Sequence, residues 1–159
     1  MAQLFSLGVY ARMIVADLPV PEALVSLIES GRWPRTSQEA IRQNLELRVP
    51  VERIRRFAPE EDWLYLCAPP FGKPADVFSK LVDFHGEPDP ESPPGDIDYD
   101  RTVVIADFGL GSDAPIALDY RQSLDCPTVI RYRWSHRGER NRWVYVAPSF
   151  SQFAEMLEL

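Results

Sequence analysis

Four segments in the second half of the chain are rich in strand-forming residues and follow one another with short connections. They comprise residues 103–108, 115–121, 128–134 and 143–147. In the third segment Ile130, Tyr132 and Trp134 alternate with Arg131 and Arg133, so the apolar side chains share one face of a strand. Strands with such short connections pair most simply with their neighbours in the chain. The second half therefore predicts an antiparallel meander.

The first half has helical spacing instead. Leu24, Leu27 and Ile28 fall on one face of a helix expected over residues 20–31, and Gly31 fits the end of that helix. Beyond it, prolines divide the chain into shorter units. These are short helices or turns in residues 36–46 and 49–62, a strand in residues 63–69, and a helix or bent strand in residues 75–86.

The last segment of the chain carries a helix start signal. Ser149 and Gln152 fit the S-x-x-Q capping box, in which the side chain of the first residue accepts a backbone hydrogen bond from the fourth. Phe150, Phe153 and Leu157 then form an apolar stripe at helical spacing. A C-terminal helix packed on the sheet is therefore expected.

These patterns predict a single α+β domain over residues 1–159, because helices and strands are segregated along the chain rather than alternating. The sheet is expected to have about five to six strands, antiparallel or mixed, with N-terminal helices and the C-terminal helix packed on it. Trp143 and Tyr145 are expected to line the sheet face beneath that last helix.

The charge balance limits the partners of such a domain. The net charge is −7, which disfavours nonspecific binding to nucleic acid or to an anionic membrane and suits a basic protein partner.

The apolar N-terminal stretch has no basic region before it and is too short to span a bilayer, so a cytoplasmic location is expected. Cys67 and Cys126 match no metal-ligand spacing and are expected to be inert small residues of the core.

Acidic residues are concentrated in a proline-rich loop at about residues 85–101, which is expected to be exposed and to serve as the partner-binding rim. They are Glu87, Asp89, Glu91, Asp96, Asp98 and Asp100. The last three have the D-x-D-x-D spacing of a calcium loop. However, Arg101 stands where such loops need glycine and Asp107 stands where they need a bidentate glutamate, so a solvated loop is the favoured interpretation.

Two motifs suggest chemistry without supplying the residues for it. Asp107-Phe108-Gly109 matches the magnesium-binding tripeptide of protein kinases, but the glycine-rich phosphate cover and the catalytic loop are missing, which favours a strand end and a turn. A metal-dependent hydrolase using Asp107, Asp113 and Asp119 remains an alternative. We expect no enzyme, no catalytic residue, no metal and no cofactor.

A basic segment lies at the predicted tip between the last two strands. It contains Arg131, Arg133, Arg137, Arg140 and Arg142. Such a patch could meet phosphate, but a solvated turn that balances the acidic loop is the favoured interpretation.

Taken in order, several short motifs resemble the C-terminal signature of the SUKH superfamily, the domain shared with yeast cell-wall-assembly regulators. The matching residues are Gly111, Ser112, Asp113, Leu118, Asp119, Arg121, Trp143, Ser149, Phe150 and Phe153. The Leu-Pro and first helix in residues 17–31 are similar to the opening of the family more weakly. The matching residues are expected to be structural.

The resemblance implies a SUKH-like fold and a binding module. Many bacterial members of the family are immunity proteins that neutralise a cognate toxin, often a nuclease or deaminase, while others are regulators or scaffolds. We therefore expect a non-enzymatic immunity protein, with an intracellular regulatory or scaffold protein as the alternative. The sequence leaves the partner and the oligomeric state open.

Overall fold

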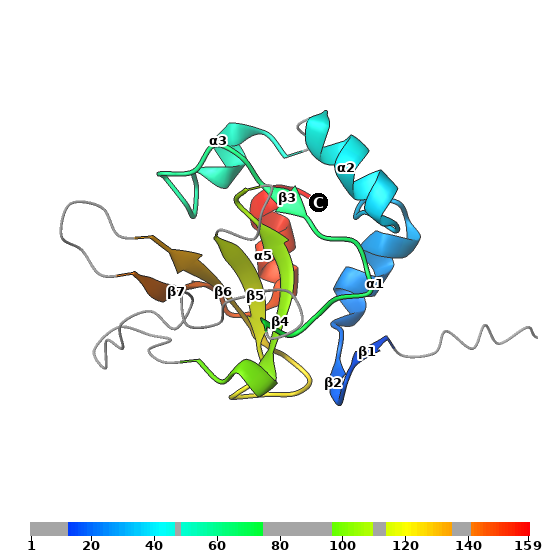
Figure 1. Cartoon of the computed structure of the whole chain (residues 1–159), viewed down its shortest axis with the longest axis vertical. Coiled ribbons are helices and arrows are strands. Elements are labelled where there is room, and N and C mark those ends of the chain that lie inside the picture. The colour runs from blue at the N-terminus through cyan, green and yellow to red at the C-terminus, as the bar shows by residue number, and fades with distance from the viewer. Residues whose placement is uncertain (1–12, 47–48, 75–96, 110–113, 135–140) are drawn as a thin grey trace, which may run out of the picture.

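The computed structural model describes residues 13–46, 49–74, 97–109, 114–134 and 141–159. Five strands form its main sheet in chain order. They are β3 (Tyr65–Leu66), β4 (Thr102–Asp107), β5 (Pro115–Asp119), β6 (Thr128–Arg133) and β7 (Arg142–Ala147). Each strand pairs antiparallel with the next, which confirms the predicted α+β class and the meander (Figure 1). Only β3 is much shorter than the sequence predicts.

Four α-helices lie in the described ranges. They are α1 (Glu22–Glu29), α2 (Ser37–Leu45), α3 (Val51–Ile54) and α5 (Phe150–Leu157). The turn after α1 ends at Gly31, whose φ of 72° is a conformation that glycine adopts at no steric cost. The side chain of Thr36 accepts the Glu39 N–H and so fixes the start of α2. No described helix has the length and apolar character needed to cross a membrane.

A small hairpin of β1 (Ile14–Val15) and β2 (Leu18–Pro19) precedes α1, and the sequence did not predict it. Its turn contains Ala16 at a φ of 57°, which a non-glycine residue adopts only at some cost. Two contacts hold the hairpin in place: Leu18 is buried in the core, and the Tyr120 hydroxyl donates to the Pro19 carbonyl oxygen at 2.8 Å. Both involve residues distant in the sequence, so local patterning carries little sign of the hairpin.

The main core lies between one face of the sheet and the helices. Helix α5 lies across the sheet, with α1 and α3 packed beside it (Figure 1). The residues of α5 in this core are Phe150, Phe153, Ala154 and Leu157, and they meet inward-facing strand residues such as Ile105, Ile116 and Leu118. The aromatic stripe predicted for the last helix is therefore the side that packs on the sheet.

A second, smaller core covers the opposite face of the sheet. It consists of Ile97, Val104, Ala117, Ile130, Tyr132 and Trp143, with Tyr99 packed against it, and it contains no residue of the four described helices. The expectation that Trp143 and Tyr145 lie under the C-terminal helix is therefore wrong. Trp143 pairs across the ladder with Tyr132 and Tyr145 pairs with Ile130, and paired residues on neighbouring strands share a face.

Candidate functional site

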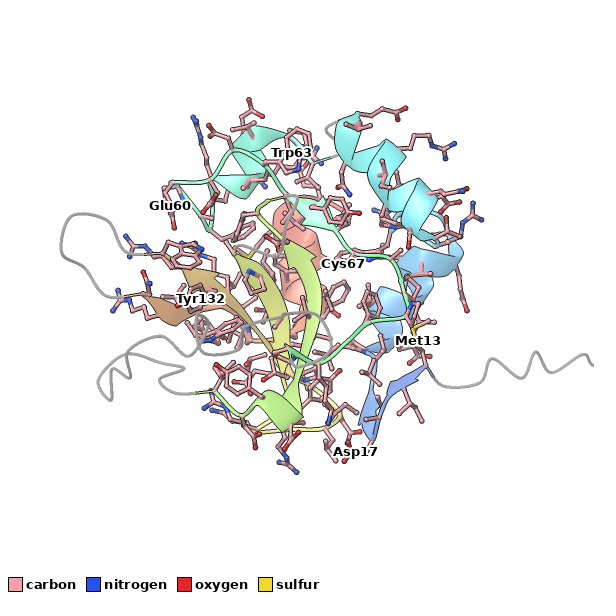
Figure 2. All side chains as sticks on the ribbon, viewed as in Figure 1. Met13, Asp17, Glu60, Trp63, Cys67 and Tyr132 are labelled. Carbon is pink, nitrogen blue, oxygen red and sulfur yellow. The ribbon has the colours of Figure 1, made fainter. Side chains whose placement is uncertain are left out.

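Four aromatic side chains form a row on the face of the sheet that lacks described helices. Tyr132 makes edge-to-face contacts with Trp134 and Trp143, with ring centroids 5.3 and 5.4 Å apart, and Tyr145 follows two residues after Trp143 on β7. Tyr132 and Trp143 are buried, whereas Trp134 is 41% exposed and Tyr145 is 46% exposed. Figure 2 labels Tyr132 on this sheet. We call Tyr132, Trp134, Trp143 and Tyr145 the aromatic row.

The acidic pair Asp98 and Asp100 lies beside the same face. Tyr99, between them, packs against the second core, while both flanking aspartates are exposed. Asp98 accepts the Asp100 N–H at 3.0 Å at the start of the 3-10 helix η2 (Tyr99–Arg101), and Lys73 Nζ lies 3.9 Å from an Asp100 oxygen. Glu87, Asp89, Glu91 and Asp96 fall outside the described residues.

Asp107, the first residue of the kinase-like tripeptide, is buried at the end of β4. Its Oδ1 accepts the backbone N–H of Gly109 at 3.0 Å and that of Ala114 at 3.1 Å. These bonds tie together the two ends of the β4–β5 connection. Asp107 therefore acts as a turn residue, as the sequence predicts.

Asp119 is also buried, and its carboxylate is bound to Arg121. It accepts the Arg121 backbone N–H at 3.1 Å, and both of its oxygens accept from the guanidinium, with Nη2 at 2.8 Å from Oδ2. On the β4–β5 ladder Asp119 pairs with Thr102, whereas Asp107 pairs with Pro115. The two aspartates thus lie at opposite ends of the ladder, about 13 Å apart along the strands at about 3.3 Å per residue.

The structure therefore does not bring together Asp107 and Asp119, two of the carboxylates of the hydrolase hypothesis. Asp113, its third member, falls outside the described residues. Elsewhere in the described ranges, no group of three or more His, Cys, Asp or Glu side chains is placed to hold a metal ion.

One of the five arginines predicted to lie in a solvated turn, Arg131, belongs instead to β6 and is not solvated. Arg131 is buried, because its position in β6 turns it toward the helical side, where Glu60 Oε1 lies 2.5 Å from its Nη2. The Arg133 Nε lies 3.5 Å from the same oxygen. Figure 2 shows Glu60 in the loop between α3 and β3. Arg137 and Arg140 fall outside the described residues, and Arg142 is half-buried.

Glu60 is the partner that sequence reasoning missed. Burial opposes its ionisation, but its own backbone N–H and the guanidinium of Arg131 outweigh that effect and hold the pKa of Glu60 below its ordinary value. Nothing local marks Glu60, because its role depends on a loop that meets β6 only in the folded chain. The alternation in β6 did predict correctly that Arg131 and Arg133 share the face opposite Tyr132.

The residues of the family-like motif occupy structural positions where they are described. Leu118, Phe150 and Phe153 are in the main core. Ser149 accepts the Gln152 N–H at 3.2 Å, as the capping box predicts. Gly111, Ser112 and Asp113 fall outside the described residues.

Comparisons of the chain with protein-family models, with curated proteins and with solved structures found no match. The resemblance to the SUKH superfamily therefore depends on the sequence motifs alone.

Proposed function

We propose that this chain is a non-enzymatic protein-binding module, and specifically an immunity protein that neutralises a cognate toxin domain. The observation that carries the proposal is the exposure of Trp134 and Tyr145 on the aromatic row, beside the exposed pair Asp98 and Asp100. Protein interfaces are enriched in aromatic anchors surrounded by a polar rim, and such anchors supply much of the binding free energy. The motif resemblance supplies the immunity role.

The charge of the chain supports a basic partner. At a net charge of −7, the protein attracts a cationic surface and speeds its encounter with it. A toxin that acts on nucleic acid carries such a surface, and carboxylates can take the place of the phosphates that it binds. We propose the acidic residues of the proline-rich loop as the electrostatic rim, namely Glu87, Asp89, Glu91, Asp96, Asp98 and Asp100.

The regulatory or scaffold alternative has the same fold and differs in its partner. The presence of a toxin gene next to the gene for this chain favours immunity, and its absence favours regulation. The hydrolase alternative loses support, since Asp107 and Asp119 are separated along the ladder and each is bound within the fold.

The direct test is co-expression of the chain with the toxin domain encoded beside its gene, followed by titration calorimetry of the purified pair. We expect growth to be rescued and a complex to form. Trp134→Ala and Tyr145→Ala should each weaken the complex tenfold or more. Leu124→Ala is the matched control, because Leu124 is similarly exposed but belongs to the β5–β6 connection. Failure of the unmodified chain to bind that toxin would contradict the immunity role.

The rim has its own test within the same complex. Replacing its six acidic residues by their amides should weaken binding and flatten the dependence of affinity on salt concentration. Unchanged affinity at low salt would place the contact away from this segment.

A further inference from the structure

Arg131 is a buried cation with most of its hydrogen-bonding capacity unused within the described part of the chain. Its side chain is 5% exposed, and its Nη2 donates to Glu60 Oε1. Its Nε and Nη1 are fully buried, and no described residue supplies a hydrogen-bond acceptor to either atom. A guanidinium has five N–H donors, and buried donors in folded proteins nearly always meet an acceptor. Arg131 is therefore placed to bind a further acceptor.

Its neighbours on the sheet are apolar. Arg131 pairs with Ile116 on β5 and with Val144 on β7, and its Cζ lies 5.6 Å from the centroid of the Phe108 ring. The aliphatic side chains carry no acceptor, and the Phe108 ring interacts with the face of the cation rather than with its N–H edge. These neighbours hold the guanidinium in place without supplying an acceptor to its N–H groups.

Arg131, Arg133 and Glu60 form a charged cluster whose polar side faces the surface. Glu60 is 23% exposed and Arg133 is 30% exposed at the side-chain level, and one oxygen of Glu60 lies near the guanidinium groups of both Arg131 and Arg133. Both guanidinium groups thus lie beside the same carboxylate oxygen.

We propose that Arg131, Arg133 and Glu60 form a binding site for a carboxylate group. A carboxylate is negatively charged, so the two guanidinium groups attract it. It is planar, and it accepts two hydrogen bonds from a guanidinium in a fixed geometry. The limited exposure of Arg131 restricts the ligand to a small group, either a free carboxylic acid or the side chain of an aspartate or glutamate on a partner.

The experiment follows the arginine Nε–H signals of the folded, full-length ¹⁵N-labelled protein by NMR, with Arg131→Lys to assign the signal of Arg131. Sodium acetate represents the free acid, N-acetyl-glutamate methylamide represents a side chain, and sodium chloride at equal ionic strength is the control. We expect a saturable shift of the Arg131 signal by acetate, with a Kd on the order of millimolar for so small a ligand. A shift with the glutamate derivative as well identifies a protein side chain as a ligand, and a shift with acetate alone identifies a free acid.

Two charge variants test the mechanism. Glu60→Gln removes the negative charge beside Arg131 and should tighten acetate binding severalfold, whereas Glu39→Gln, which removes a carboxylate paired with Arg35, should leave it unchanged. If Glu60→Gln does not fold, Arg133→Gln should weaken acetate binding at least threefold, while Arg55→Gln, on an exposed pair with Asp62, should not.

The proposal is overturned if acetate and chloride shift the signal equally, since that reports screening alone. It is also overturned if a cluster variant and its control change the affinity for acetate equally. A third outcome against it is magnetisation exchange between the Arg131 Nε–H and a long-lived bound water that acetate does not displace.

Discussion

The side-chain amide of Asn44 binds both backbone groups of Leu66: its Oδ1 accepts the Leu66 N–H at 3.2 Å, and its Nδ2 lies 3.5 Å from the Leu66 carbonyl oxygen. Leu66 belongs to β3, the edge strand of the main sheet. A helical side chain thereby occupies the place of a neighbouring strand. The indole Nε1 of Trp33 donates to the next carbonyl oxygen, that of Cys67, at 2.8 Å. This edge of the sheet is covered, which removes a site for unwanted strand pairing.

Asn44→Ala should destabilise the fold by about 2–3 kcal/mol, because it leaves the buried backbone groups of Leu66 without partners. Urea unfolding followed by circular dichroism measures the change. Gln38→Ala is the control, since Gln38 is exposed on the same helix, and its effect should stay within about 0.5 kcal/mol. Equal effects of the two substitutions would mean that the Asn44 amide has no special role.

Asp107→Ala should lower the free energy of unfolding by about 2–4 kcal/mol, because the N–H groups of Gly109 and Ala114 lose a charged acceptor. The control is Asp62→Ala, which removes an exposed carboxylate. The two variants are compared by their free energies of unfolding at neutral pH.

Thermal melts of the unmodified protein should not respond to Mg²⁺, because Asp107 is bound within the fold. A saturable rise in Tm with Mg²⁺ that Asp107→Ala abolishes would restore the metal hypothesis.

The two thiols should react at very different rates. Burial, and after it the charge of Asp107, raises the pKa of Cys67 to about 12. Cys126 is exposed in a hollow of about 330 Å³ between the first turns of α1 and α5, so the expectation that it is an inert core residue is wrong. With a chromogenic disulfide reagent at pH 8, one equivalent of thiol should react quickly and the second only after denaturant is added. Cys126→Ser should abolish the fast phase, and a fast phase that persists in this variant would contradict the raised pKa of the half-buried Cys67.

Glu39 should titrate well below its usual range. Hydrogen bonds from the Arg35 side chain and backbone lower its pKa from 4.5 to about 2. Because the folded value is the lower one, the stabilisation by this carboxylate is present above about pH 4.5 and is lost as the pH falls toward 2. Carboxyl ¹³C NMR should show this titration, and Arg35→Gln should return it to the ordinary range. Arg55→Gln, an equal change of charge elsewhere, should leave it in place.

The pattern of the second half was enough to predict most of the sheet. The alternation in β6 and the short connections around it depend on neighbours in the chain, so β4, β5, β6 and β7 begin and end within about two residues of their expected limits. The start of α5 follows for the same reason, since Ser149 and Gln152 are only three residues apart. The acidic rim was a prediction from composition, and it stays a prediction.

The candidate sites depended on contacts between distant parts of the chain. Strand periodicity places Arg131 opposite Tyr132, but it does not say which face the helices cover or that Glu60 will meet Arg131. The aromatic row formed on the side away from α5, because the register pairs Trp143 with Tyr132. The sequence by itself thus determined the class of fold, the strand order and the helix caps, all of which depend on short-range periodicity and hydrogen bonding. The tertiary structure decided which face of the sheet the helices cover, and it decided the hairpin β1–β2 and the buried charge cluster. Side chains far apart in the sequence gain partners only when the whole chain packs.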